Sequence, residues 1–547
     1  MKSRMLFAAL AALAVSASSL AQAPAPEAAE FSADAFRAHV AFLADDLLEG
    51  REAGTRGFDI AARYVATQFA GLGLTPGANG GWYQPVDFAQ IRLAGAPTLT
   101  VAGRTFTQGH ELAMRASADA APLDLEARLV FAGYGLDMPA HGFDDYRGLD
   151  VRGRIVVVLS GTPAGIPSDV AAHLNGDKRR MAAARGAVGL ITIRTRADSE
   201  ATPWARAACG GGRPLTTWVE PGGAPFSDSG GLRFTASVDD SAAHALFQTA
   251  PRPLDAVLDD AALPGRRPRG FALHGTARVT REASQVSRFA SENVLAVLPG
   301  SDPSVAQEYV LLMAHLDHLG IREPGADDPP GADRINNGAM DNATGIATLI
   351  EVARQMSRPG HRSRRPILFA AVTAEEKGLL GAQFLSRHPV TGDGRIVAAV
   401  NLDMPVLTYD FQDVTAFGAE HSTMGPIVAR AAARMGVGVS PDPLPEEGLF
   451  TRSDHYRFVQ QGVPAVFLMT GFENGGGARF HAFLDTRYHS VRDDLSQDFN
   501  WQAGARFARL NYLIARELAD GAEPPRWYEG SFFGDAFGGD RPRARRP

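Results

Sequence analysis

The segment RPILFAAVTAEEKGLLGAQFLSRH, Arg365–His388, joins an apolar run to a helix-like stretch through two adjacent glutamates. Its first half is continuously apolar, which is typical of a strand buried on both faces, and its second half has helical spacing. Glu375 and Glu376 therefore lie where the strand ends. Their like charges repel, and burial raises the cost of ionising either one. A cation bound beside one glutamate explains the pair better than the start of a surface helix does.

The same alternation of strand and helix extends on both sides of this segment, from about residue 290 to residue 519. Such alternation with continuous apolar strands predicts an α/β fold, a mostly parallel (mixed) sheet covered by helices on both faces. Ligands in such sheets bind at the carboxyl ends of the strands. The strands are expected in NVLAVLPG, EYVLLMAHLDHLG, IVAAVNLDM and VPAVFLMTG, and helices in TGIATLIEVARQM, MGPIVARAAARMG and WQAGARFARLNYLIARELA.

Three regions of the 547-residue chain differ in pattern, and the chain is too long for one ordinary domain. Residues 31–94 begin with two helix-like stretches and 95–285 are dominated by short β-like runs such as GRIVVVLSG. Residues 286–520 carry the alternation. We therefore expect a domain split into two parts by an inserted smaller α/β domain, followed by a flexible tail over 521–547.

Bulk properties restrict the location and the partners. Residues 1–21 combine a basic start, an apolar core and a small-residue cleavage site, which predicts a signal peptide and a periplasmic or secreted protein. No later segment approaches 18 uninterrupted apolar residues, so we expect no membrane anchor. The net charge of −7 argues against nucleic acid as a partner. Cys209 is the only cysteine, so no internal disulfide is possible.

Acidic and imidazole side chains collect at the predicted strand ends. Imidazole and carboxylate ligands without thiolates suit zinc or a similar divalent ion. Two such ions need about five protein ligands, one of them shared. Five residues supply that number: His315, Glu376 and Asp403 at strand ends, Asp341 just before a helix, and His489 late in the chain. Asp317 lies two residues from His315, on the same side of the strand, where its carboxylate can orient the imidazole.

The chain resembles the co-catalytic zinc exopeptidases, the family of secreted bacterial aminopeptidases and glutamate carboxypeptidase. Residues 125–195 are similar to the protease-associated domain that many members insert. The resemblance covers most of residues 31–515. It rests on LEGREAGTRGFDIAARYVATQFAGLGL, AHLDHLG, NGAMDNATG, AVTAEEKGLLGAQFL, NLDM, RSDHYRF and YHSVRDD, which occur in family order.

The resemblance implies that Asp341 bridges two Zn²⁺ ions. It implies that Glu376 and His489 complete one metal site, and His315 and Asp403 the other.

The resemblance also implies a catalytic mechanism. Glu375 is the general base for a metal-bridging water that attacks a peptide carbonyl, and Asp317 orients a ligand. The bond Asp341–Asn342 is expected to be cis. Peptides are the expected substrates.

An aminopeptidase is the favoured function, and three alternatives stay open. A carboxypeptidase of the glutamate-carboxypeptidase type would need a guanidinium for the substrate carboxylate, for which Arg206 or Arg213 could serve. A glutaminyl cyclase usually needs a single zinc ion. A catalytically inactive binding protein would usually have lost ligands or the base. We expect His318 to be a wall residue, and Ser453-Asp454-His455 to shape the pocket.

Overall fold

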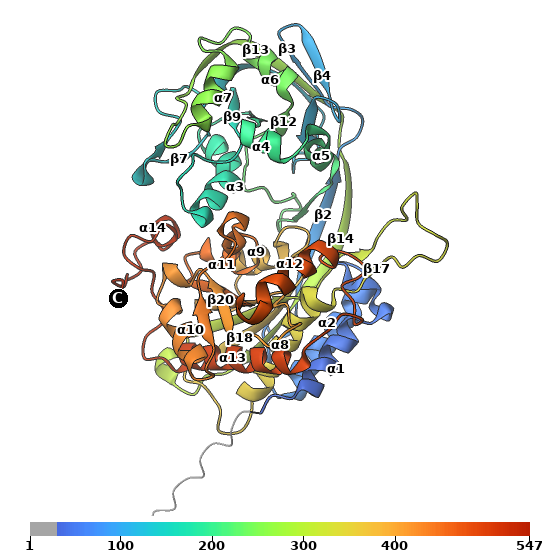
Figure 1. The fold of residues 1–547 in the computed structure, drawn as a ribbon, viewed down its shortest axis with the longest axis vertical. Helices are drawn as coiled ribbons and strands as arrows, with labels where there is room; N and C mark the ends of the chain where they lie inside the picture. Colours follow the sequence, from blue (N-terminus) through green and yellow to red (C-terminus); the bar gives the residue numbers. More distant parts are fainter. Residues whose placement is uncertain (1–29) are drawn as a thin grey trace, which may run out of the picture.

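The computed structural model describes residues 30–547, in which two lobes, each built on its own sheet, lie one above the other (Figure 1). The predicted signal peptide lies outside the described residues. We call the part around the ten-stranded sheet the large lobe and the part around the eight-stranded sheet the small lobe.

The large lobe carries a mixed sheet, as predicted. Parallel pairing runs through its four central strands, and antiparallel pairs flank them. The central strands are buried along most of their length, as expected for strands covered on both faces. In spatial order the strands are β11 (Leu215–Trp218), β2 (Tyr83–Arg92), β14 (Gln285–Leu298), β18 (Ile367–Val372), β15 (Glu308–His315), β19 (Arg395–Leu402), β22 (Ala465–Thr470), β20 (Asp413–Phe417) and β21 (Gly438–Ser440), with β1 (Thr75–Pro76) beside β14.

Helices cover both faces of this sheet. One group packs together, with its members α8 and α13 against β15: α1 (Ala33–Leu43), α2 (Arg56–Gly71), α8 (Thr344–Met356), α10 (Met424–Ala433) and α13 (Trp501–Asp520). Helices α9 (Leu380–Arg387) and α11 (His455–Val459) form a second group on the other side. Ser32 and Thr55 begin α1 and α2 by accepting backbone N–H groups of the first turn. Within residues 30–547, no helix combines the length and apolarity needed to cross a bilayer.

The small lobe repeats the plan of a parallel centre with antiparallel flanks. Its strands, in spatial order, are β4 (Arg104–Thr107), β3 (Thr98–Val101), β13 (Phe271–Arg281), β6 (Leu123–Phe131), β9 (Ile155–Leu159), β10 (Gly189–Ile193), β12 (Phe234–Val238) and β5 (Leu112–Arg115). Its helices are α3 (Ser168–Ala184), α4 (Arg196–Ala201), α5 (Trp204–Cys209), α6 (Asp240–Leu246) and α7 (Leu254–Ala262).

Two long antiparallel strands connect the lobes. β2 and β14 pair from Tyr83 opposite Val294 to Arg92 opposite Gln285, and the small lobe follows from their far ends (Figure 1). Residues 215–218, expected in the inserted domain, instead form β11 and pair with β2 at the edge of the large sheet. The chain therefore returns to the large lobe once in the middle of the insertion.

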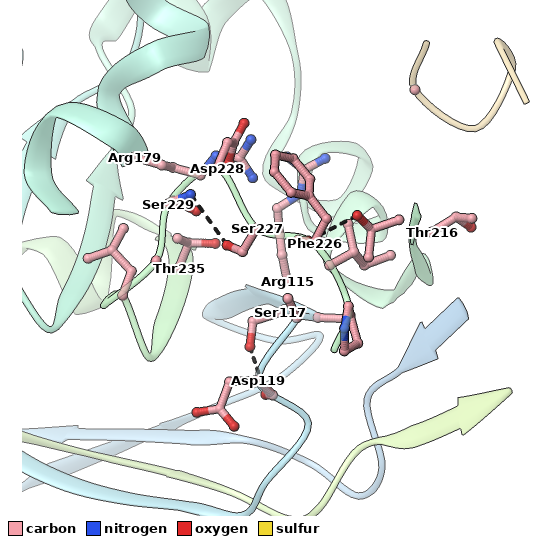
Figure 2. A pocket seen from close by; sticks show the side chains of 18 of the residues that line it. Arg115, Ser117, Asp119, Arg179, Thr216, Phe226, Ser227, Asp228, Ser229 and Thr235 are labelled. Atoms are coloured by element: carbon pink, nitrogen blue, oxygen red, sulfur yellow. Dashed lines mark hydrogen bonds between the residues drawn. The ribbon is translucent and has the colours of Figure 1, made fainter. Parts of the chain in front are cut away.

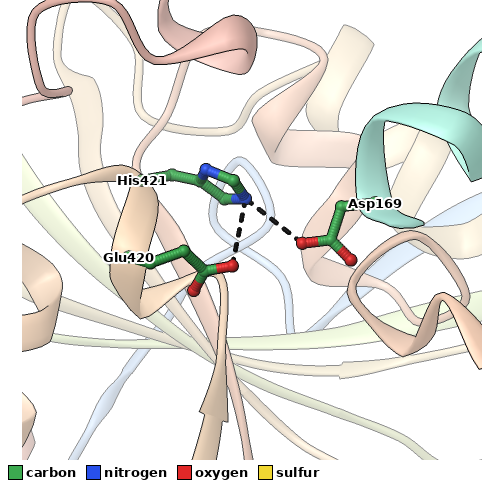
Figure 3. A group of neighbouring side chains, drawn as sticks. All are labelled: Asp169, Glu420 and His421. Atoms are coloured by element: carbon green, nitrogen blue, oxygen red, sulfur yellow. Dashed lines mark hydrogen bonds and ion pairs between the residues drawn. The ribbon is translucent and has the colours of Figure 1, made fainter. Parts of the chain in front are cut away.

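The lobes also meet through side chains. His421 of the large lobe directs Nε2 at Asp169 Oδ2 of α3, 3.3 Å away, and at its own neighbour Glu420 Oε1, also 3.3 Å away (Figure 3). On α3, His173 pairs with the hydroxyl of Tyr456 at 2.6 Å.

Residues 521–547, for which the sequence predicts a flexible tail, pack against the folded chain. The ring of Trp527 is buried, and its Nε1 donates to Gly462 O at 2.9 Å. Phe533 of α14 (Phe532–Phe537) is fully buried and lies against Phe450 and Tyr456. Burial of these rings, which lie in a glycine- and proline-rich segment, holds the tail in place.

Candidate active site

The predicted acidic and imidazole residues converge at the carboxyl ends of the central strands. His315 is the last residue of β15, Glu375 and Glu376 follow β18, and Asp403 follows β19. These three strands are neighbours and run parallel, so their ends meet at one edge of the sheet.

Two further residues reach the same edge from outside the sheet. Asp341 lies in the irregular turn Ala339–Ala343 that leads into α8, and the Asp341–Asn342 peptide bond is cis, as expected. His489 follows α12 (Gly476–Thr486).

Asp341 lies between two groups of side chains. Its Oδ1 is 3.2 Å from His315 Nε2, and its Oδ2 is 3.3 Å from His489 Nε2. His315 Nε2 is also 3.2 Å from Asp403 Oδ1, and His489 Nε2 is 3.1 Å from Glu376 Oε2. The five residues thus form two groups that share one carboxylate.

The spacing of these atoms fits divalent cations. Ligand atoms around a tetrahedral zinc ion with bonds of about 2.0–2.1 Å lie about 3.3 Å apart. The distances of 3.1–3.3 Å within the two groups match that separation. The cluster is therefore able to bind zinc.

The pKa values of the imidazoles in the cluster also favour a bound cation. Burial opposes a charged imidazole, yet neighbouring carboxylates, with Asp341 first, hold the pKa of His489 at about 10. Burial likewise opposes charge on His315, but Asp403 and Glu375 keep its pKa well above the usual range. Buried carboxylates here require positive charge among them, which protonated imidazoles supply in the absence of a metal ion.

His318 contacts the second group. Its Nδ1 is 2.7 Å from Glu376 Oε1 and 4.0 Å from Asp341 Oδ2, whereas its Nε2 is buried without a hydrogen-bond partner. His318, which we predicted to line the wall, therefore contacts Oε1 of Glu376, whereas His489 faces Oε2 of the same glutamate.

Asp317 differs from the prediction in which of its groups contacts His315. The backbone carbonyl of Asp317 accepts the Nδ1–H of His315 at 3.0 Å, whereas the carboxylate is 4.0 Å away. The carboxylate instead accepts the backbone N–H of Glu375 at 3.0 Å and of Glu376 at 3.3 Å. Asp317 thus fixes the imidazole with its main chain and the glutamate pair with its side chain.

Asp493 makes the same kind of contact on the other side, and sequence reasoning missed it. Its two oxygens accept the backbone N–H groups of Met340 and Asp341, each at 2.9 Å. Asp493 is fully buried, and burial raises its pKa to about 6. It belongs to the YHSVRDD segment, which would have been the only signal for it.

Arg51 supports the turn that carries Asp341. It is buried and donates to Leu316 O at 3.0 Å, Asn337 O at 2.6 Å and Gly338 O at 3.1 Å, and also to Leu43 O. It lies in the LEGREAG segment, so this early stretch of chain positions residues almost 300 positions later.

Ser453 and Asp454 adjoin Asp403. The Ser453 hydroxyl donates to Asp403 Oδ2 at 2.5 Å and accepts from Asn401 Nδ2 at 2.6 Å. Asp454 is fully buried with both carboxylate oxygens unpartnered, and burial raises its pKa to about 8.

A cavity of about 240 Å³ opens onto the cluster. Glu375 lines it together with ligand candidates from both groups. Burial, followed by the charges of Glu376 and Asp403, raises the pKa of Glu375 well above its usual range. The far wall is mostly apolar and is formed by Leu449, Phe467, Met469, Phe480 and Leu484.

Known proteins share this architecture. The profile of peptidase family M28 matches residues 293–515. Leupeptin-inactivating enzyme 1 of Streptomyces exfoliatus is 29% identical over 217 residues, which cover 37% of this chain and 43% of that protein. Aminopeptidase Y of Saccharomyces cerevisiae is 27% identical over 248 residues, 44% of this chain and 40% of that protein. The matches thus span less than half the length of these two relatives.

A solved structure extends the likeness in fold over almost the whole chain. The aminopeptidase from Aneurinibacillus sp. strain AM-1 superposes with a TM-score of 0.50 at 19% identity, covering 90% of this chain and 95% of that one.

Proposed function

Because residues 293–515 belong to peptidase family M28, we propose that the protein is a zinc-dependent aminopeptidase that removes N-terminal residues from peptides. The observation that carries this proposal is the position of Asp341, whose two oxygens face two separate groups of imidazole and carboxylate ligands. Aminopeptidase Y and the Aneurinibacillus protein are both named as aminopeptidases, which supports the choice of the amino terminus.

Two divalent ions complete the proposed site. His315 and Asp403 would hold one ion, Glu376 and His489 the other, and Asp341 would belong to both. When bound, such ions polarise a carbonyl and make a water molecule acidic near neutral pH.

Glu375 would act as the general base. It lines the cavity beside the ligands without being required by either group. It would take a proton from the attacking water and return it to the leaving amine. Asp317 holds the backbone N–H of Glu375, so the carboxylate is oriented before substrate arrives.

The apolar wall of the cavity favours an apolar N-terminal side chain. The side chains of Phe467, Met469 and Leu484 would bury such a side chain. Each Å² of apolar surface removed from water in this way stabilises the complex by about 25 cal/mol. The carboxypeptidase, glutaminyl cyclase and inactive-protein alternatives have no comparable support at this site.

The remaining assignments follow from the sequence patterns. Residues 1–21 are proposed as a cleaved signal peptide, which would place the enzyme in the periplasm or outside the cell. The small lobe is proposed as a protease-associated domain inserted over 95–285, between the two parts of the peptidase domain at 31–94 and 286–520.

Hydrolysis of matched peptides tests the proposal. Leu-Ala-Phe with a free amino terminus should lose leucine, and the acetylated peptide should stay intact. A chelator should abolish the reaction, and zinc should restore it. Release of phenylalanine instead would support a carboxypeptidase, and no hydrolysis after zinc is restored would contradict both activities.

A further inference from the structure

Both carboxylate oxygens of Glu376 face imidazole rings. Oε2 is 3.1 Å from His489 Nε2, and Oε1 is 2.7 Å from His318 Nδ1. The two rings are themselves neighbours, with centroids 5.9 Å apart and planes tilted by 68°. His489 is one of the five ligand candidates, whereas the proposed function gives no role to His318. The contact of His318 with Glu376 therefore needs an explanation of its own.

The two distances at Glu376 indicate two kinds of contact. Two ligand atoms of one zinc ion lie about 3.3 Å apart, which suits the 3.1 Å between Glu376 and His489. A separation of 2.7 Å is too short for that arrangement and is typical of an N–H that donates to a carboxylate. His318 Nδ1 is also 4.0 Å from Asp341 Oδ2, which is beyond hydrogen-bond distance. His318 is thus a hydrogen-bond donor to Glu376 and not a sixth ligand.

The sequence neighbours of Glu376 line two different cavities, and Glu376 lines neither. Glu375 lines the cavity of about 240 Å³ at the candidate active site. Lys377 lines a larger cavity of about 590 Å³, part of whose polar wall is drawn in Figure 2. The side chain of Glu376 is only 6% exposed, and that of His318 is fully buried. A buried carboxylate oxygen needs a hydrogen-bond partner from the protein, and His318 supplies one to Oε1.

Packing holds the ring of His318 in place. Its backbone N–H donates to the carbonyl oxygen of Arg51 at 3.2 Å. A Cβ on Gly338 would lie 2.7 Å from the His318 ring, so a glycine at this position lets the ring approach the backbone closely. Nδ1 faces Glu376, while Nε2 is buried and has no hydrogen-bond partner within residues 30–547. The ring is therefore oriented for one contact, the one to Glu376.

We propose that His318 is a positioning residue, which holds Oε1 of Glu376 by a hydrogen bond so that Glu376 presents Oε2 to the cation that it shares with His489. Residues that orient a metal ligand in this way typically contribute about 10- to 100-fold to metal affinity. The inference rests on the proposed function, since it assigns a residue that supports one of the two proposed metal sites.

The effect of His318 is confined to one of the two sites. His318 donates to Glu376, whereas within residues 30–547 no hydrogen bond or ion pair joins its ring to His315 or Asp403. Loss of the contact should therefore weaken the site of Glu376 and His489. The site of His315 and Asp403 should keep its affinity.

Two substitutions of nearly equal shape separate hydrogen bonding from packing. In His318→Asn the amide nitrogen can take the place of Nδ1 and donate to Glu376, whereas His318→Leu has the same branched outline and no donor. Competition between metal-free protein and a chromogenic chelator would measure the two zinc-binding steps. We expect His318→Leu to weaken one step about 10- to 100-fold and leave the other unchanged, and His318→Asn to retain both. Thermal unfolding of the metal-free variants checks that both fold.

Chains with a single proposed metal site assign the weakened step. Asp403→Ala leaves the site of Glu376 and His489 complete, and His489→Ala leaves the site of His315 and Asp403. Adding His318→Leu should weaken zinc binding in the Asp403→Ala chain and not in the His489→Ala chain. The same substitution is thus its own control.

The outcomes separate this inference from the proposed function. Zinc affinities that fall no further in His318→Leu than in His318→Asn, or equal weakening of both steps, would overturn the role of His318 even if leucine is released from Leu-Ala-Phe. Loss at one step in His318→Leu and retention in His318→Asn, without peptide hydrolysis by the native chain, would support the role of His318 and contradict the aminopeptidase activity.

Discussion

The carboxylate of Asp317 accepts the backbone N–H of Glu375 at 3.0 Å, although the two residues follow different strands. The same carboxylate takes the N–H of Glu376, and the main chain of Asp317 holds His315. One buried residue thus fixes two metal-ligand candidates and the proposed base. The contact also explains how two adjacent glutamates keep different directions at the end of a buried strand.

The substitution Asp317→Asn should lower peptide hydrolysis about 10- to 100-fold with little change in fold. An amide presents one acceptor oxygen, so one of the two backbone N–H groups loses its partner, and losses of that size are usual for groups that orient ligands. Peptide hydrolysis and zinc titration would measure the effect on turnover and on metal affinity. Asp327→Asn, in an exposed loop, is the matched control and should match the wild type.

Glu375→Gln should retain its metal and lose catalysis. The amide fills the same space but cannot accept a proton, and general-base catalysis contributes about 10²- to 10⁴-fold. The measurements are metal content by elemental analysis and kcat at saturating peptide. A variant that keeps near wild-type kcat would show that another group takes the proton.

Metal content should distinguish the shared ligand from an unshared one. Native mass spectrometry should find two zinc ions per wild-type chain, one in Asp403→Ala, and none held tightly in Asp341→Ala. The reason is that Asp341 faces both groups, whereas His315 is the one ligand candidate that Asp403 contacts among the five. Equal metal content in the two variants would contradict a bridging role for Asp341.

Acidification should weaken the contact between the lobes through His173. Burial lowers the pKa of this imidazole from 6.5 to about 4. Between those values the unfolded chain takes up a proton that the folded chain does not, so stability falls as the pH falls. The contribution is about 2 kcal/mol between pH 7 and pH 5.

Urea unfolding at pH 7 and pH 5 would measure this difference. His173→Gln should reduce the pH dependence by about that amount, and His274→Gln, an exposed residue of β13, should not. An unchanged pH dependence in His173→Gln would show that the ring is protonated as easily in the folded chain as in the unfolded one.

The convergence of the site could be predicted because it depends on strand direction. Apolar runs locate the strand ends before Glu375 and Asp403, and parallel pairing brings those ends together. The roles of these residues as ligands and base stay predictions. Asp493 was missed because its function depends on backbone N–H groups some 150 residues away. No local pattern of residues encodes such a contact.

The same reasoning explains the differences in the fold. β11 is four residues long, and only its pairing with β2 makes it a strand of the large sheet. The rings of Trp527 and Phe533 are buried, but in the sequence they lie among glycines and prolines. That composition predicts a flexible tail, and the packing of the rings is visible only in the structure.

The exit and the return of the chain at the small lobe lie side by side, because Arg92 is directly opposite Gln285 in the β2–β14 ladder. A short turn could therefore replace the entire excursion and close these strands into a hairpin. The shortened protein would keep His315, Asp341 and Glu376 but lose β11 and the whole small lobe. Comparing its peptide preferences with those of the full chain would separate the chemistry of hydrolysis from the selection of what is hydrolysed.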